Sequence, residues 1–418
     1  MRESSCASRP SARLTLTSAL LALLRQRLRA TPGAVLEVAA GVHRREHSFE
    51  FFAAAIDSAL RPAAIVRFAQ LPRSLEGISH HWWEGFDVPR GDRPRIDVFL
   101  HEERGASAAV LVSGRVLPLG ELLIVGPRME RWIPSKPPPE LMGEVPADGP
   151  MSRYIGALGG REVLLRLQSL RIAIVGSARL ASGLAIGLAR AGVAEITLID
   201  PDILEEHSRD AMEVLARSRA GIPKVHAVAE MLRAIAPEVS VIPLPVPIEH
   251  PLAVEHCAGA DVLMSAPDRN APRLLAALIA AAFLRPHIDI GTGVFRERGQ
   301  LIAGADLRLT IPGNGCLWCV GSLDLERRHD VDWRRQRAGS LRSLNSLAVA
   351  HAQFLLERFV IGDVEASTWL QTALDERAIL SPRRMPRAVM TDCPICSLAG
   401  RGDEALPTDL RASRPSVS

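Results

Sequence analysis

The sequence predicts an α/β protein with a Rossmann-like, mostly parallel sheet covered by helices on both faces, a CxxC…CxxC zinc site and a smaller N-terminal α+β domain. The sheet is predicted because short apolar runs, among them RIAIVG, EITLID and HIDIG, alternate with helix-like stretches between residues 151 and 319. Strands that alternate with helices pair in parallel, and the helices cover both faces. The zinc site is predicted because two CxxC motifs, GCLWC and DCPIC, follow this region.

The first block, residues 1–132, has the signals of a small α+β domain. Residues 13–29 carry apolar side chains at helical spacing, interrupted by arginines. This pattern predicts an amphipathic helix and not a signal peptide or a membrane span, because both of those need an uninterrupted apolar run. VLEVAAGV, AAIVRFA, IDVFL, AAVLVSG and ELLIVG then follow as short β-branched runs between turn signals, which predicts strands.

Proline and glycine punctuation divides the rest of the chain. Residues 133–150 contain six prolines, which cannot lie inside a helix or a central strand, so they are predicted to be a linker. The α/β domain with its zinc site then spans residues 151–405 and includes a long helix in SLRSLNSLAVAHAQFLLERFV. Residues 406–418 are predicted to be a disordered tail.

Composition restricts the function classes. The 418-residue chain has 47% hydrophobic residues and a formal net charge of +3. It lacks the clustered basic runs with interleaved aromatics that nucleic-acid binders carry, so we expect no nucleic-acid partner. Paired CxxC motifs without an even spread of other cysteines fit a reducing compartment, and we therefore expect a cytoplasmic protein.

The turn after RIAIVG is a candidate nucleotide-phosphate site, because the chain there passes from a strand into a helix N-terminus. In GSARLASG only Gly176 and Gly183 are glycines, and Arg179 stands between them, so this loop alone is weak evidence for a nucleotide. Asp200 ends the next strand, 24 positions after Gly176, where an acid can accept ribose hydroxyls. A turn-forming aspartate is the alternative interpretation of Asp200.

The two CxxC motifs place four thiols at zinc-ligand spacing: Cys316, Cys319, Cys393 and Cys396. Four thiolates suit a tetrahedral structural zinc, and the long separation suits a clamp that ties a late segment back onto the fold. Buried free thiols are the alternative.

Several motifs together resemble the ThiF/MoeB-type family, which includes the activating enzymes of ubiquitin and ubiquitin-like proteins. They are RYIGALGG…LRIAIVG, ITLIDPDILEEHSRD, GIPKVHAVAEMLRAIAP, DVLMSAPDRNAPR, HIDIGTG, GCLWC and DCPIC, in the order and at the spacings of that family. The resemblance covers residues 151–403, and the combination is far more specific than any one motif.

This resemblance implies adenylation: the C-terminal carboxylate of a ubiquitin-like or sulfur-carrier β-grasp protein attacks the α-phosphate of Mg-ATP. Lys224 in GIPKV matches the family lysine that reaches the phosphates, and a solvated helix lysine is the alternative. Asp268 in SAPDR matches the acid that holds Mg²⁺, and Asp200 matches the ribose acid. The family is commonly dimeric, so we expect a homodimer. Arg153 in SRYIG is the candidate to reach the partner's nucleotide, with a surface arginine as the more favoured interpretation.

The chain also departs from the family pattern. Ser208 and Ala211 occupy the positions of the family's phosphate-contacting Asn and Arg, and Arg209 is the nearest guanidinium. Arg179 replaces a loop glycine and either supplies positive charge or fills the phosphate site. Two interpretations follow: an active, divergent adenylyltransferase, or an inactive scaffold that keeps the fold to bind a ubiquitin-like protein. A third, an NAD(P) oxidoreductase, would need a GxGxxG loop.

A thioester step is not predicted, because Cys257 in EHCAGAD has the features of a core residue. In the first block, His80 and His81 invite comparison with JAB-type metalloproteases, but adjacent histidines cannot easily share one ion. We therefore expect a degenerate JAB-like or unassigned module that docks a partner, with Trp82 and Trp83 as candidate anchors.

Overall fold

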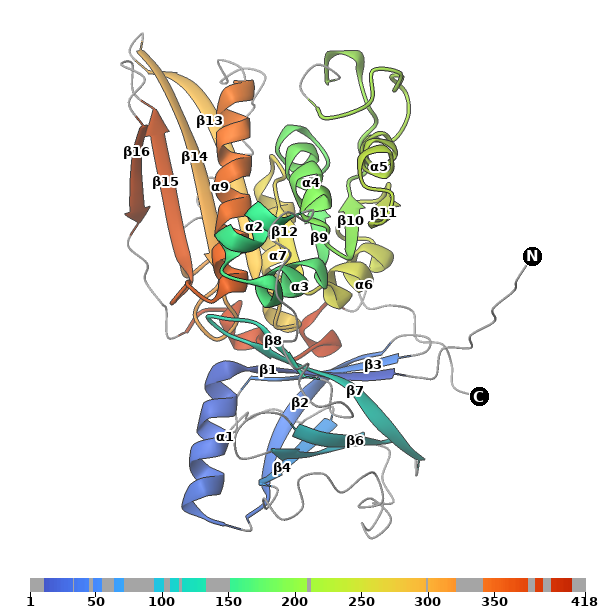
Figure 1. Ribbon diagram of the computed structural model, residues 1–418, viewed down its shortest axis with the longest axis vertical. Coiled ribbons are helices and arrows are strands. Elements are labelled where there is room, and N and C mark those ends of the chain that lie inside the picture. Colours follow the sequence, from blue (N-terminus) through green and yellow to red (C-terminus); the bar gives the residue numbers. More distant parts are fainter. Residues whose placement is uncertain are drawn as a thin grey trace, which may run out of the picture.

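A computed structural model describes residues 11–32, 34–44, 48–54, 64–70, 94–100, 106–112, 115–132, 151–208, 212–297, 300–320, 341–374, 380–385 and 392–407. The described chain forms two units stacked along the long axis of the molecule (Figure 1). Each is built on an eight-stranded sheet. The linker expected at 133–150 lies outside the described residues, as do His80, His81, Trp82 and Trp83.

The sheet of the N-terminal unit closes on itself. Its order is β1-β3-β2-β4-β5-β6-β7-β8, and an additional pairing joins β1 to β7. The long strand β7 makes the closure possible, because its first part pairs with β6 and its later part pairs with β1 and β8. The strands are β1 Ser11–Thr17, β2 Leu36–Arg44, β3 Ser48–Ala53, β4 Ala64–Gln70, β5 Arg95–Leu100, β6 Ala106–Val112, β7 Arg115–Val125 and β8 Glu130–Trp132.

Helix α1, Ser18–Ala30, packs Leu20, Leu24 and Leu28 into the core of this unit. The Thr17 side chain caps it by accepting a hydrogen bond from the Leu20 N–H at 3.2 Å. The helix predicted from residue 13 thus begins later, and this prediction was wrong for residues 13–17. They form β1, which pairs in parallel with both β3 and β7, and tertiary pairing overrides the local helical spacing.

The second unit confirms the predicted α/β fold. Its sheet has the order β11-β10-β9-β12-β13-β14-β15-β16, parallel from β11 to β13 and antiparallel beyond. Strand order reverses between β9 and β12, and ligands bind at the carboxyl ends of strands at such a reversal. The strands are β9 Arg171–Val175, β10 Glu195–Ile199, β11 Ser240–Leu244, β12 Val262–Ser265, β13 His287–Glu297, β14 Gln300–Thr310, β15 Thr368–Leu374 and β16 Leu380–Met385.

Helices cover both faces of this sheet. Side chains of β9 show it, because Ile172 and Ile174 pack with α4, α5 and α9, whereas Ala173 and Val175 pack with α6 and α7. Such burial on two faces explains the continuous apolar runs of the sequence. The helices are α2 Ser152–Leu158, α3 Arg161–Gln168, α4 Arg179–Ala191, α5 Lys224–Ile235, α6 Pro251–Gly259, α7 Asn270–Ala282 and α9 Arg342–Ile361.

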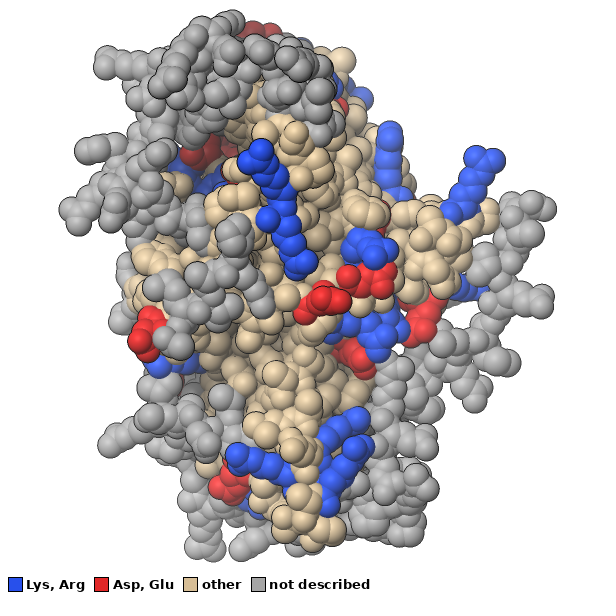
Figure 2. Space-filling model, turned by 90° about the vertical axis from the view of Figure 1, so that its left-hand side faces the viewer, with Lys and Arg blue, Asp and Glu red and all other residues tan. Residues whose placement is uncertain are grey.

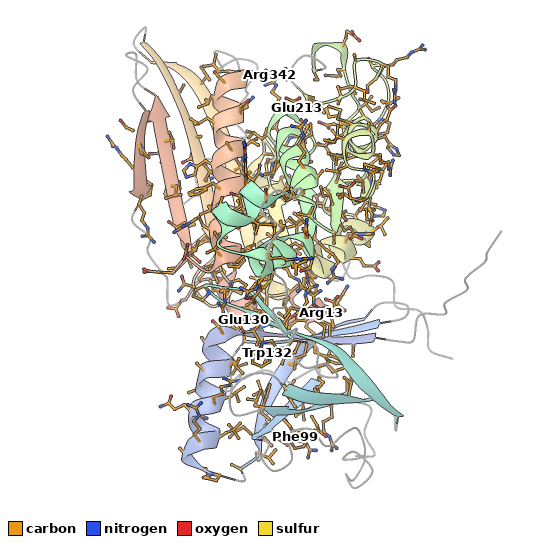
Figure 3. All side chains as sticks on the ribbon, viewed as in Figure 1. Arg13, Phe99, Glu130, Trp132, Glu213 and Arg342 are labelled. Carbon is orange, nitrogen blue, oxygen red and sulfur yellow. The ribbon has the colours of Figure 1, made fainter. Side chains whose placement is uncertain are left out.

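The two units meet through buried charges at the amino ends of β9 and β12. The fully buried Asp261 accepts hydrogen bonds from Arg13 at 2.7 Å and from Arg131 at 2.8 Å, both of the N-terminal unit. Figure 3 shows Arg13 between the two units. The fully buried Arg285 contacts Glu50 of β3 at 2.7 Å. The N-terminal unit therefore covers the sheet edge opposite the carboxyl ends.

The segment after the second CxxC motif joins the two units a second time. We call residues 399–406 the C-terminal strap. Gly41 of β2 donates its N–H to Gly400 at 3.1 Å, and Val42 forms a bridge with Gly402. A Cβ at Gly41 would lie 2.3 Å from the Arg401 carbonyl carbon, so only glycine fits. Leu406, expected at the start of a disordered tail, is buried and belongs to the same apolar cluster as Phe52.

No helix among the described residues is long and apolar enough to cross a membrane. Charged side chains are spread over the face in Figure 2, where small groups of Lys and Arg alternate with Asp and Glu on a mostly uncharged surface.

Candidate nucleotide site and zinc centre

The turn between β9 and α4 depends on Gly176. Its φ of +99° is favourable only for glycine, and its N–H donates to Ile199 at the end of β10 at 2.8 Å. A Cβ here would lie 3.4 Å from the Ala266 carbonyl, so the turn also packs against the loop after β12. Gly176 therefore holds together the carboxyl ends of β9, β10 and β12.

Asp200 is buried at this edge and organises two loops with its carboxylate. Its Oδ2 accepts hydrogen bonds from the Ser177 N–H at 2.7 Å and the Ser177 hydroxyl at 3.0 Å. Its Oδ1 accepts the N–H of Asp202 at 2.8 Å. These bonds use both lone pairs of Oδ2 and one of Oδ1, so Oδ1 keeps one acceptor site that a ribose hydroxyl can use.

Arg179 is the first residue of α4, and no side chain caps this helix at Ala178. Uncapped N–H groups at a helix N-terminus can bind an anion, and a guanidinium beside them adds positive charge. Gly183, the other glycine of the loop, has a different use. A Cβ there would lie 3.4 Å from Val349 of α9, so this glycine sits at a close contact between the two helices.

Lys224 begins α5 and is not a solvated lysine. Its side chain is 12% exposed, and its Nζ lies 2.6 Å from the Asp202 carboxylate. The backbone supports this pair, because the Lys224 N–H donates to the Asp202 carbonyl at 2.9 Å. The structure thereby brings Lys224 and Asp200 into one cluster through Asp202.

Asp268 is exposed in the loop after β12, which Gly176 contacts through Ala266. Arg273 of α7 holds this loop by donating from Nε and Nη2 to the Pro267 carbonyl at 3.0 and 2.7 Å. Arg273 also pairs with the fully buried Asp289 of β13 at 2.5 Å. The candidate magnesium acid thus sits beside a clamped backbone.

Behind this loop lies a buried polar cluster that the sequence interpretation missed. Ser265 donates to Asp289 at 2.6 Å and contacts His287 Nε2 at 2.8 Å, and Arg308 reaches Asp289 at 2.9 Å. Burial lowers the pKa of His287 to about 4. Burial acts to raise the pKa of Asp289, but Arg273 and Arg308 outweigh it and lower that pKa. The sequence signal that could have revealed this cluster is the presence of His287 and Asp289 inside the otherwise apolar run HIDIG.

The structure shows less about the remaining predicted site residues. Ser208 ends a short 3₁₀ turn, Glu206–Ser208, and Arg209 and Ala211 lie outside the described residues. Arg153 is exposed on α2. At the carboxyl edge, the Ser182 hydroxyl of α4 accepts the Glu213 N–H at 3.1 Å, and Glu213 pairs with Arg342 of α9. Figure 3 shows that pair at the end of the molecule away from Arg13.

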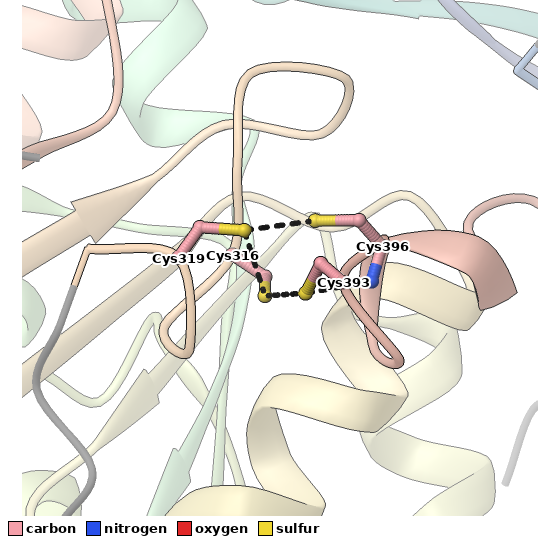
Figure 4. A group of neighbouring side chains, drawn as sticks. All are labelled: Cys316, Cys319, Cys393 and Cys396. Carbon is pink, nitrogen blue, oxygen red and sulfur yellow. Dashed lines mark hydrogen bonds between the residues drawn. The ribbon is translucent and has the colours of Figure 1, made fainter. Parts of the chain in front are cut away.

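The four predicted zinc ligands converge. Their sulfur atoms lie within 4.8 Å of one another, with Cys316–Cys393 at 3.5 Å and Cys319–Cys396 at 3.6 Å (Figure 4). A tetrahedral zinc with Zn–S bonds of about 2.3 Å needs sulfur–sulfur distances of about 3.8 Å, so the cluster fits zinc. All four cysteines are free of disulfides.

Cys257 is a fully buried core residue, and burial raises the pKa of its thiol to about 12, which argues against a nucleophile.

Comparison with known proteins identifies the family of this chain. A sequence model of the ThiF family matches residues 151–363, half of the chain. The chain belongs to the ThiF family. This ThiF-family chain is 32% identical over 110 residues to the SAMP-activating enzyme E1 of Haloferax volcanii, covering 26% of this chain and 41% of that protein. It is 33% identical over 144 residues to the adenylyltransferase and sulfurtransferase uba4 of Aspergillus clavatus, covering 34% of this chain and 29% of that protein.

The ThiF-family chain therefore spans less than half the length of these curated relatives. Among solved structures, E. coli MccB with ATP is similar at 19% identity and a TM-score of 0.48, covering 62% of this chain and 76% of that one.

Proposed function

We propose that this ThiF-family chain is an ATP-dependent adenylyltransferase that activates the C-terminal carboxylate of a ubiquitin-like or sulfur-carrier protein. A carboxylate oxygen attacks the α-phosphorus of ATP, an acyl–phosphate bond forms, and the bond to the β-phosphate breaks. The products are an acyl-adenylate and pyrophosphate. The named activities of the relatives support this class of reaction.

The observation that carries the proposal is the cluster of Asp200 and Lys224 at the carboxyl ends of β9 and β10. In it, Ser177 holds Oδ2 of Asp200 at the phosphate turn, and the remaining acceptor site of Oδ1 binds a ribose hydroxyl. The uncapped N-terminus of α4 and Arg179 face the phosphates. Lys224 supplies the positive charge that stabilises the phosphates as the carboxylate attacks.

Asp268 is the residue proposed to hold Mg²⁺, a hard cation that prefers carboxylate oxygen and supplies charge neutralisation at the phosphates. The position of its loop supports this role, because the Pro267 carbonyl before it is fixed by Arg273. We propose Ser208 and Arg209 as further phosphate contacts, in place of the Asn and Arg that the family uses.

The zinc centre is a structural part of the proposal. Zn²⁺ bound by Cys316, Cys319, Cys393 and Cys396 would lie against α7, which begins shortly after Asp268. No chemistry of the reaction is assigned to it.

The test is ATP binding by calorimetry on zinc-loaded protein, with and without Mg²⁺. We expect Lys224→Ala and Asp268→Ala each to weaken Mg-dependent binding by at least about tenfold, the scale of one lost charged contact. Arg217→Ala is the matched control, because this side chain is 72% exposed and pairs only at the surface of α5. Wild-type protein that binds no ATP would overturn the proposal and favour the scaffold interpretation. Variants that bind ATP normally would overturn the assignment of these residues to the site.

With ATP binding established, ATP–pyrophosphate exchange measured with β-grasp proteins ending in Gly-Gly identifies the substrate.

We further propose a cytoplasmic homodimer without a nucleic-acid partner, in which Arg153 reaches the second copy's nucleotide. Light scattering of the purified protein measures the dimer, and a monomer at all concentrations would contradict it. The N-terminal unit is proposed to dock a partner protein.

A further inference from the structure

Asp202 connects the two nucleotide-site residues of the proposed function. Its N–H is bound by the Asp200 carboxylate at 2.8 Å, and its own carboxylate binds Lys224 Nζ at 2.6 Å. A single residue therefore joins the proposed ribose acid to the proposed phosphate lysine. The family resemblance assigned it no role.

The backbone around Asp202 is held independently of its side chain. Leu204 donates its N–H to Ile222 at 2.8 Å, and Gly221, with a φ of +96°, donates back to Leu204 at 2.8 Å. Ile203 and Pro223 form an isolated antiparallel bridge. These contacts bring residue 202 beside residue 224 without help from the carboxylate, so removing the carboxylate alone leaves the frame in place.

Stability does not explain the Asp202–Lys224 pair. The Asp202 side chain is 62% exposed, and an ion pair with such a partner contributes little to folding. Its effect falls on the lysine, whose long side chain has many rotamers that binding would otherwise have to restrict. An ammonium group has three donors, so one bond to Asp202 leaves two for phosphate oxygens.

We propose that Asp202 is a positioning residue that holds the Lys224 ammonium toward the phosphates before ATP arrives. This inference rests on the proposed function, because it assigns Lys224 to the same site. It predicts that loss of the Asp202 carboxylate weakens ATP binding only as long as Lys224 is present.

A double-mutant cycle tests the proposal. ATP dissociation constants are measured by calorimetry for wild type, Asp202→Ala, Lys224→Ala and the double variant, all zinc-loaded and with Mg²⁺. We expect Asp202→Ala to weaken binding about five- to tenfold in the wild-type background and not at all in the Lys224→Ala background. Asp202→Asn, which keeps an oxygen acceptor, should lose less than Asp202→Ala.

Glu230→Ala is the matched control, because it removes a 42%-exposed acid of α5, the helix that Lys224 begins, and this acid likewise pairs with a basic side chain, that of Arg217. It should leave ATP binding unchanged. Tighter binding by Asp202→Ala would show that Asp202 competes with phosphate, and an equal loss in both backgrounds would show that it acts without Lys224. Either result overturns the inference while leaving the proposed function standing. Wild-type protein that binds no ATP overturns both.

Discussion

At the scale of single residues, the carboxyl edge of the second sheet is organised by charged groups that are hidden from solvent. Asp289 holds Arg273, and Arg273 in turn holds the Pro267 carbonyl next to Asp268. His287 lies beside this chain of contacts, and its Nδ1 has no hydrogen-bond partner among the described residues. A neutral His287 is therefore the form that the fold accommodates.

His287 should make folding stability depend on pH. Its pKa falls from 6.5 in the unfolded chain to about 4 in the folded protein because burial opposes the charged form. Between these values the unfolded state binds the extra proton, so stability falls as the pH falls from about 6.5 to about 4, by up to about 3 kcal/mol. Urea unfolding at several pH values measures it. In His287→Asn this part of the pH dependence should disappear, and parallel curves for the two proteins would contradict the prediction.

Several site residues were predictable from the sequence and others were not. Gly176 and Asp200 stand at strand ends, so the alternation of elements places them near one another, whereas Lys224 was predicted from the ThiF/MoeB-type resemblance. Asp202 and Arg273 act through contacts with a second loop. Their roles depend on side-chain directions that spacing does not specify.

At the scale of elements, the zinc centre and the C-terminal strap form one connected structure. Cys393 and Cys396 bracket the turn that starts the 3₁₀ helix η4, Cys396–Leu398, and η4 packs on α7. The strap continues along α7, where Gly400 and Gly402 donate to Ala281 and Ala282 at 3.1 and 3.0 Å. A zinc ion held by the four cysteines would fix the point from which the strap reaches β2.

Cys393→Ser should remove zinc and lower the melting temperature. We expect a fall of at least about 5 °C, because binding of a structural zinc contributes to folding free energy and each lost kcal/mol lowers Tm by a few degrees. Elemental analysis and thermal unfolding measure the two effects. Cys257→Ser, which changes a buried thiol in α6 away from the cluster, is the control and should keep its zinc. Full zinc content in Cys393→Ser would remove the structural-metal assignment.

At the scale of the whole molecule, the N-terminal unit is part of one folded structure with the ThiF-family unit. Asp261 is fully buried at the junction and is neutralised by Arg13, Arg131 and Arg171. Burial acts to raise the pKa of Asp261, but the three arginines outweigh it and hold that pKa far below its usual range. The three arginines thus favour the charged form of this carboxylate.

Removal of this charge should destabilise the whole protein. Asp261→Asn removes the fully buried charge that Arg13 and Arg131 contact and leaves the more exposed Glu121 as the carboxylate that they share, and breaking a buried ion pair in this way costs about 3–5 kcal/mol. The surface pair Arg358–Asp363 is the control, since both side chains are more than 40% exposed and Asp363→Asn should cost less than about 1 kcal/mol. The urea concentrations at which Asp261→Asn and Asp363→Asn are half unfolded measure the two effects. Equal midpoints would show that the junction contributes little.

The parallel sheet could be predicted from the sequence, whereas the closed N-terminal sheet and its docking could not. RIAIVG and EITLID are buried on both faces and bounded by helices, which is local information. Strand β1 shows the limit, because its residues also fit a helix and their structure is decided by pairing with β3 and the distant strand β7. Arg13 and Asp261 are 248 positions apart, a contact that no local pattern specifies.

The strap has a consequence for how the protein is made. During synthesis β1 to β8 leave the ribosome long before Asp261, Arg285 and the strap exist, and domains that emerge first generally fold first. Until then Arg13, Glu50 and the open edge at Gly41 face the solvent and whatever chaperone meets the nascent chain. Gly400 and Arg401, which fill the space beside Gly41, are translated after the strands and helices of the second unit, so this part of the junction is completed only once that unit has been made.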